Sequence, residues 1–365
     1  MTKPQVRELR ELHLDAVEKS AATTTRRLAL AVLVFACAFL WLLLTVELIN
    51  DHFDRISRGR QILVYGERPF SDFRDPGYFL TLYASAAAQA MSGGSLLGEA
   101  VIDSAAIAFA VAITFLLAAR VAESTGIGLV AAIFTLIVAP RYYDYDKVLF
   151  YTAGLALAWR YADDRRLRTL LVAAMVTVAA GLFRYDNGVF LFAATLTTLV
   201  FCHWRTVHEL LGRSAAYTAG VALGLAPALI TWQQTVGVSE VWRQVRAYAQ
   251  LEGERTGVFK APIPQFDAAR SLVSSLVRPE NHPVLLYYVI VALLPVAAAA
   301  LLWRWYRTDS KRSMEHEAPK VAATVVLGVL VAVFILRDPI LARLGTAVAP
   351  AASLRAWLAA AAVPS

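Results

Sequence analysis

The strongest constraint on this fold is a series of apolar runs that recurs along almost the whole chain. Crossing a bilayer as a helix takes about 20 mainly apolar residues, with a range of roughly 17 to 25. Nine runs approach or reach that length, at 28–49, 100–119, 126–139, 148–162, 167–183, 188–202, 214–232, 284–303 and 320–336. A tenth, at 354–363, is too short to span alone, and the runs at 126 and 148 would rise only about 22 Å.

The amino-acid composition also indicates that the chain lies in a lipid bilayer. Hydrophobic residues make up 58% of the 365-residue chain and charged residues 17%, whereas a soluble domain has nearer a quarter charged. A soluble bundle or a mixed sheet would explain one or two short runs, but not nine. We therefore expect an all-α, polytopic membrane protein with about nine to ten transmembrane helices.

The placement of Lys and Arg predicts the orientation of these helices. Tight basic clusters fall at 26–27, 160–168, 205–213 and 304–312, with Arg120 beside another run. Because basic loops tend to stay in the cytoplasm, we place the tail 1–27 and these clusters inside. The outer segments are then 50–99, 140–147, 184–187, 233–282 and a short tail or incomplete last span at 341–365. The net charge of +7 reflects this scatter and indicates no nucleic-acid partner.

The long outer segments contain amphipathic stretches. DHFDRISRGRQIL at 51–63 is expected to form a helix that lies at the membrane surface, and YFLTLYASAAAQAM at 78–91 a second interfacial helix or a re-entrant one. VSEVWRQVRAYAQLEGE at 238–254 begins the last long segment in the same way, before two prolines at 262 and 264 stop it. Interfacial helices should therefore cover the outer end of the bundle.

The outer segments also hold an unusual mixture of acids and cations. Charged groups at the ends of spans are costly unless they are paired, hydrated or used, so they are functional candidates. Each alone is equally consistent with an interfacial anchor or a local ion pair. The set comprises Asp51, Asp54, Asp72, Asp75, Asp144, Asp146 and Asp186 with Arg141, Lys147, Arg184 and Arg337.

The mixture suits transfer of a sugar from a phosphate. Fixed cations bind an anionic phosphate leaving group, and a carboxylate removes the proton from an acceptor hydroxyl. On this reading Arg141, Lys147 and Arg184 bind the donor phosphate. No Gly-rich phosphate loop and no G-x-S-x-G motif is present, and no histidine pair has the spacing of metal ligands.

The order of these pieces resembles the GT-C class of integral-membrane glycosyltransferases, which use polyprenyl-phosphate sugars. The similarity covers roughly residues 28–340 and rests on HFDRIS (52–57), YGERPFSDFRDPGYFL (65–80), PRYYDYDK (140–147) and LFRYDNG (182–188). It implies a general base in the first outer loop, either Asp54 or Asp51, with Asp72 as a further candidate.

The resemblance implies further roles, among them a donor-phosphate-binding Arg after the last full span, which is Arg337 here. Asp75, Tyr143 and Asp186 would orient the substrate, and the D-x-D of Asp144 and Asp146 could hold Mg²⁺ or Mn²⁺, although no cofactor is required. The expected function is inverting transfer from a polyprenyl-phosphate sugar to a glycan, lipid or protein acceptor on the outer face of the plasma membrane. A transporter or flippase of lipid-linked saccharides and a non-catalytic membrane scaffold are the alternatives.

Overall fold

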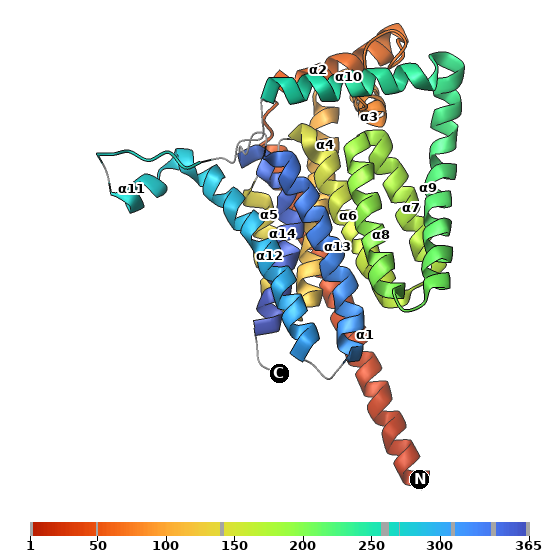
Figure 1. Ribbon diagram of the computed structural model, residues 1–365, viewed down its shortest axis with the longest axis vertical. Coiled ribbons are helices and arrows are strands. Elements are labelled where there is room, and N and C mark those ends of the chain that lie inside the picture. The colour runs from red at the N-terminus through yellow and green to blue at the C-terminus, as the bar shows by residue number, and fades with distance from the viewer. Residues whose placement is uncertain are drawn as a thin grey trace.

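The protein is a long helical bundle with a cap of surface helices at one end (Figure 1). The computed structural model describes residues 3–48, 50–138, 142–256, 263–269, 271–307, 311–336 and 341–362, and across these the regular elements are all helical. The α-helices are α1 (Lys3–Leu44), α2 (Asn50–Arg60), α3 (Phe79–Met91), α4 (Leu97–Val121), α5 (Thr125–Ile137), α6 (Tyr145–Asp164), α7 (Leu167–Phe183), α8 (Tyr185–His203), α9 (Val207–Thr235), α10 (Val238–Thr256), α11 (Leu272–Leu276), α12 (His282–Arg307), α13 (Lys311–Ile335) and α14 (Leu341–Ala362). Short η segments are η1 (Gln61–Tyr65), η2 (Tyr142–Asp144) and η3 (Pro279–Asn281).

The predicted all-α polytopic membrane class is confirmed. Six segments are long and apolar enough to cross a membrane: Thr23–Leu44, Leu97–Val121, Tyr185–His203, Val207–Thr235, Pro279–Arg304 and His316–Ile335. Two shorter apolar helices, α5 and α7, lie beside them, and α6 and α14 complete the bundle. The helices α5, α6, α7 and α14 correspond to apolar runs of the sequence but are not among the six candidate spans, so the runs outnumber the spans.

Helix α6 packs against α4, α7, α8, α13 and α14 and carries several of the largest buried side chains among the described residues. Tyr151, Leu155 and Trp159 are each at most 3% exposed and pack in one core with residues of α8, α13 and α14. The Trp159 indole Nε1 donates to Thr324 Oγ1 at 3.0 Å, which satisfies its polar atom inside the apolar core. The packing of α6 therefore fixes the position of the residues at its N-terminus.

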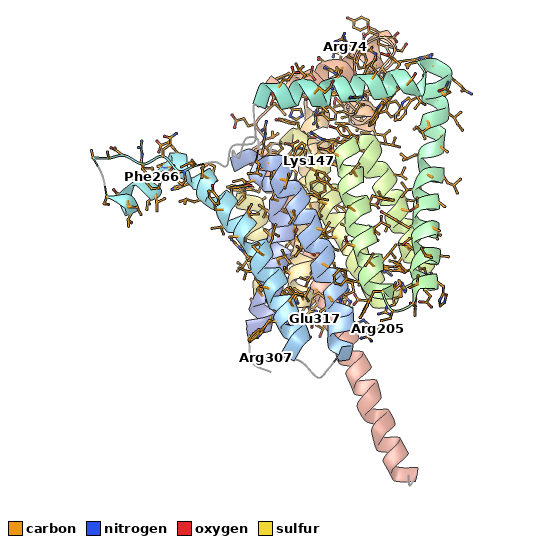
Figure 2. All side chains as sticks on the ribbon, viewed as in Figure 1. Arg74, Lys147, Arg205, Phe266, Arg307 and Glu317 are labelled. Atoms are coloured by element: carbon orange, nitrogen blue, oxygen red, sulfur yellow. The ribbon has the colours of Figure 1, made fainter. Side chains whose placement is uncertain are left out.

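The two ends of the bundle differ in charge and in covering. At one end lie α2, α3 and α10, with Lys147 just beneath them; at the other lie Arg205, Arg307 and Glu317 (Figures 1 and 2). The start of α1 projects from this second end. There Asp163 pairs with Arg120 at 2.9 Å and with Lys320 at 2.5 Å, joining α4, α6 and α13. The amphipathic stretches predicted at 51–63, 78–91 and 238–254 thus form helices at the capped end (Figure 1).

The C-terminal segment differs from the expected outer tail. Helix α14 begins at Leu341, runs along the bundle and ends at the uncapped end (Figure 1). Leu344, Val348 and Leu354 are at most 1% exposed, and the residues around them are mostly alanine and glycine. The small residues lower the hydropathy of the segment, which is why the apolar run seemed to start only at 354.

Candidate functional site

The capped end brings together residues from four distant segments of the chain. Segment η2 with the start of α6, the turn between α7 and α8, helix α2 and the loop before α3 all lie at this end, as α10 does (Figure 1). The turn between α7 and α8 is short because two packed helices must reverse direction within a few residues. The charged side chains of these turns are therefore held by the bundle itself.

Three cations and three carboxylates form a buried cluster at this end. The Lys147 Nζ lies 2.7 Å from Asp144 Oδ1, and the Arg184 Nε donates to Asp186 Oδ1 at 2.7 Å. Arg55 Nη1 lies 3.9 Å from Asp146 Oδ1, and Arg184 Nη1 lies 3.9 Å from Asp144 Oδ1. All six residues are at most 6% exposed. Because burial of an unpaired charge is very costly, this mutual pairing is what allows the cluster to exist.

Tyr78 joins the cluster from above. The centroid of its ring lies 4.8 Å from the Arg55 guanidinium carbon and 4.9 Å from that of Arg184, so two cations contact this one ring. Burial raises the pKa of the Tyr78 phenol far above its usual value, and the neutral ring is the form that attracts cations. Arg55 also donates to the backbone carbonyl of Tyr143, which ties α2 to the α5–α6 turn.

The D-x-D carboxylates are held by protein groups. Burial alone would raise the pKa of Asp144, but Lys147 and Arg184 outweigh it and hold that pKa down at about 2. The Asn187 amide donates to Asp146 Oδ2 at 2.9 Å. The metal-binding role of Asp144 and Asp146 and the phosphate-binding role of Lys147 and Arg184 remain predictions. In the structure their charges are balanced by one another.

Asp75 forms the turn that carries Tyr78. Its Oδ1 accepts from the backbone N–H of Gly77 at 2.8 Å and of Tyr78 at 2.7 Å, an arrangement typical of aspartate before a turn. Gly77 has a φ of 99°, which favours glycine at this position. Burial raises the pKa of Asp75 to about 6, despite these two hydrogen bonds. Its Oδ2 has no hydrogen-bond partner among the described residues.

A polar cavity of about 270 Å³ lies on one side of this turn. Asp54 and Asp75 both line it, so the structure brings together two acids that the sequence separates by 21 positions. Three arginines line it as well: Arg58, Arg74 and Arg243. Arg58 Nη2 lies 3.1 Å from Asp54 Oδ1, and its Nη1 donates to the Arg74 carbonyl at 2.6 Å. The cavity therefore offers carboxylates and guanidinium groups side by side.

An apolar cavity of about 590 Å³ lies on the other side of the same turn. It extends between α7, α8 and α9, and its lining includes Gly77, Phe79, Gly181, Leu225 and Trp232. Helix α10 covers both cavities: Val241 and Val245 face the apolar one, and Gln244 and Tyr248 face the polar one. The amphipathic stretch predicted at 238–254 thus covers both cavities, with a different set of side chains facing each one.

The remaining predicted residues lie near this site or outside the described chain. Asp51 is exposed and its Oδ2 accepts from the Tyr143 hydroxyl at 2.9 Å. Asp72 is also exposed and accepts from the Arg68 backbone N–H at 2.7 Å, so it shapes the loop. Arg141 and Arg337 lie outside the described residues.

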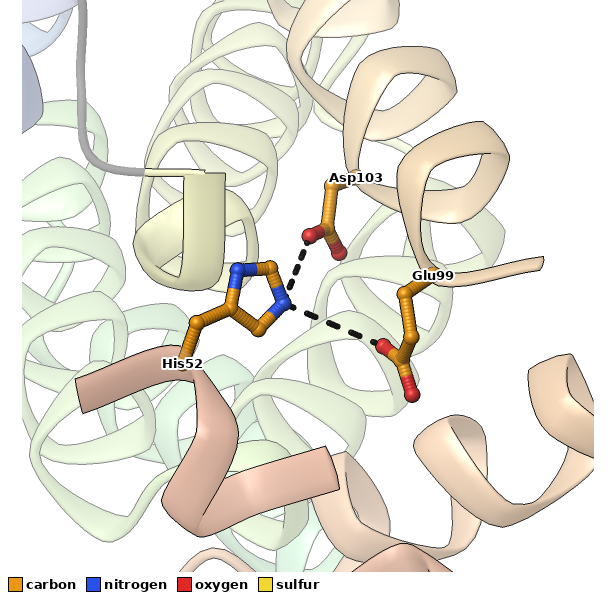
Figure 3. Close-up of side chains that lie close together, drawn as sticks. All are labelled: His52, Glu99 and Asp103. Carbon is orange, nitrogen blue, oxygen red and sulfur yellow. Dashed lines mark ion pairs between the residues drawn. The ribbon is translucent and has the colours of Figure 1, made fainter. Parts of the chain in front are cut away.

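Sequence reasoning missed Arg55 and Tyr78 of the buried cluster and six further residues of this end. Arg58, Arg74 and Arg243 looked like ordinary surface charges because nothing in the sequence shows that α10 folds over the first loop. His52, Glu99 and Asp103 come together from α2 and α4 (Figure 3). The available signal was Asp103, an acid four residues after Glu99 inside an apolar run.

Comparison of the chain with protein-family models, with curated proteins and with solved structures finds no match. The function is therefore inferred from the geometry of this end of the bundle.

Proposed function

We propose that the protein is a membrane glycosyltransferase that moves a sugar from a polyprenyl-phosphate donor to an acceptor hydroxyl on the outer face of the plasma membrane. The observation that carries this proposal is the shared wall at 75–78. One turn separates an apolar cavity from a polar one lined by carboxylates and arginines. Such a pair of compartments suits one amphiphile, with its tail in the first and its head in the second.

The apolar cavity suits the prenyl tail. Its walls are formed by helices long and apolar enough to span a bilayer, α8 and α9, so a lipid chain would pass from membrane to cavity without meeting water. Glycines at 181 and 188 line it where α7 and α8 pack closely, since a Cβ on Gly188 would lie 2.6 Å from the Gly181 Cα. Burying a chain there gains about 25 cal/mol for each Å² of apolar surface removed from water.

The polar cavity suits the phosphate and the sugar. A guanidinium group binds phosphate through two parallel hydrogen bonds, and Arg58, Arg74 and Arg243 supply three such groups. Arg58 and Arg243 are balanced by Asp54 and by Glu240, the latter at 2.5 Å. An incoming phosphate would compete for these exposed pairs, which are individually weak in water.

Asp75 is the best-placed general base. A carboxylate works most effectively when its pKa is near the working pH, and burial raises that of Asp75 to about 6. Its unpartnered Oδ2 would accept the proton of the acceptor hydroxyl while the oxygen bonds to the anomeric carbon. The bond from that carbon to the phosphate breaks in the same step, phosphate leaves with the electron pair, and the configuration inverts. Asp54, at the same cavity, is the alternative base.

The test is a transfer assay on the purified full-length protein, with a radiolabelled polyprenyl-phosphate sugar and a panel of glycan acceptors. Loss of a general base lowers the rate by about 10²–10⁴-fold, so Asp75→Asn should fall in this range. The wild-type rate should rise with pH through about 6, as Asp75 loses its proton. Asp164→Asn is the control, because it removes an i,i+4 pair with Arg160 at the opposite end of the bundle.

The outcomes separate the alternatives. Full activity in Asp75→Asn but not in Asp54→Asn would transfer the role of base to Asp54. Full activity in both variants would contradict the proposal for this cavity. If labelled lipid moves between vesicle leaflets without sugar transfer, the protein is a transporter. Neither transfer nor movement with every donor tested would favour a scaffold.

A further inference from the structure

A second cluster of polar side chains lies deeper at the capped end and takes no part in the proposed transfer. His52 projects from α2, and Glu99 and Asp103 project from the first turns of α4 (Figure 3). Residues four apart share one face of a helix, so both carboxylates point toward the same ring. All three residues are at most 4% exposed, and Asp103 is fully buried.

The spacing of the donor atoms fits a metal ion. The His52 Nε2 lies 3.0 Å from Asp103 Oδ2 and 4.0 Å from Glu99 Oε2, and one donor atom from each residue lies within 4.8 Å of the others. Tetrahedral bonds of about 2.0 Å place ligand atoms about 3.3 Å apart. The two distances to the imidazole bracket this value, so small rotamer changes would seat an ion between the three groups.

The polar atoms of this cluster are otherwise poorly satisfied. Asp103 Oδ1 and the second ring nitrogen, His52 Nδ1, have no hydrogen-bond partner among the described residues, and Asp103 Oδ2 meets only the His52 Nε2, at 3.0 Å. Two carboxylates and one imidazole in a buried space carry excess negative charge. Buried carboxylates are normally hydrogen-bonded, paired or coordinated to a metal, and a divalent cation would supply the missing charge.

One ligand is already oriented by its surroundings. The Ser85 hydroxyl, from α3, donates to Glu99 Oε1, which leaves Oε2 directed at the imidazole. Gln89 Nε2 lies 3.3 Å from the Ser85 Oγ and donates to the Ile56 carbonyl at 2.9 Å. Outer hydrogen bonds of this kind hold the ligands of metal sites in place.

We propose that His52, Glu99 and Asp103 form a binding site for a divalent first-row transition metal, with Zn²⁺ the preferred ion. An imidazole nitrogen with two carboxylates suits Zn²⁺ better than Mg²⁺, which favours oxygen ligands alone. Three protein ligands leave a fourth position for water. The ion would tie surface helix α2 to α4, and so fix the helix that carries Asp54 and Arg55.

The test measures metal binding directly and needs no transfer activity. Full-length protein in detergent is stripped with EDTA, dialysed and titrated with Zn²⁺, Mn²⁺ or Mg²⁺ by calorimetry, with bound metal counted by elemental analysis. We expect one Zn²⁺ per chain, bound at least about tenfold more weakly by His52→Ala and Asp103→Asn. Ser85→Ala should weaken binding by about 10–100-fold, the usual cost of removing an outer hydrogen bond. His203→Ala is the control, because His203 is also buried but pairs with Glu209, 3.1 Å away.

A second readout keeps the proposal open to refutation if a variant fails to fold. Co²⁺ added to the stripped wild-type protein should give the intense visible absorption of a four-coordinate ion, and Zn²⁺ should abolish it. Absence of that absorption, or equal zinc content in wild type and Asp103→Asn, would overturn the proposal. The cluster would then be an imidazolium paired with carboxylates.

Discussion

The buried carboxylate of Asp75 predicts an unusual pH dependence of stability. Its pKa in the folded protein is about 6, raised by burial from an ordinary value of 3.8. Between these values the folded chain binds more protons than the unfolded chain, so stability falls as pH rises through this window. The difference between the pKa values of about 6 and 3.8 lowers the free energy of unfolding by about 3 kcal/mol at pH values above 6, relative to pH values below 3.8.

Asp75→Asn removes this dependence. Asparagine has no charge to bury at any pH, and its side-chain oxygen retains the acceptor that holds the N–H groups of Gly77 and Tyr78. The variant should therefore gain about 3 kcal/mol relative to wild type between pH 4 and pH 7. Unfolding entropy of about 2.1 cal/mol/K per residue converts this into a relative rise in Tm of about 4 °C for a chain of this length.

The assay is thermal unfolding in detergent, followed by tryptophan fluorescence at half-unit steps from pH 4 to pH 7.5. Asp267→Asn is the matched control, because the Asp267 Oδ1 also accepts from the N–H two residues on, at 3.0 Å, in a more open turn. A difference in Tm between Asp75→Asn and wild type that stays constant across the pH range would refute the reasoning.

Two further substitutions test the packing and the buried charges. Gly188→Ala would place a Cβ 2.6 Å from the Gly181 Cα, so α7 and α8 must separate, and we expect a loss of about 1–3 kcal/mol of stability in thermal unfolding. Gly212→Ala meets open space in α9 and should instead stabilise by up to about 1 kcal/mol, and equal effects of the two would contradict this packing. Asp144→Asn leaves the buried Lys147 ammonium without its carboxylate and should cost about 3–5 kcal/mol, measured as a lower midpoint in denaturant. An unchanged midpoint would show that the ammonium finds another partner.

Much of the architecture could be predicted from apolar periodicity and charge placement. The runs beginning at 28 and 284 correspond to spans, and the amphipathic stretches at 51 and 238 form α2 and α10. These predictions succeed because hydrophobic length and amphipathicity are local properties of the chain. Helix α14 was misjudged because its alanines and glycine bury well against close helices while contributing little hydropathy.

The site was predictable only in outline. That the acids and cations of separate loops gather at one end follows from counting spans. Which of them pair does not, because it depends on the rotation and depth of each helix. Asp54 and Asp75 share a cavity through the fold of the first loop, whereas Lys147 and Arg184 turn inward to Asp144 and Asp186. His52 meets Glu99 and Asp103 for the same reason, across 47 and 51 positions of sequence.

The position of α10 has a consequence for how an amphiphile would enter and leave the two cavities. Helix α10 lies across both cavities. Its Gln244 side chain holds it to the first loop, because it donates to the Phe70 carbonyl at 2.9 Å and accepts from the Asp75 N–H at 3.2 Å. Tilting α10 would open the apolar cavity and the polar cavity at the same time. The tail and the headgroup of a lipid would then enter in a single event. A molecule that has only a tail or only a headgroup would contact only one side of α10.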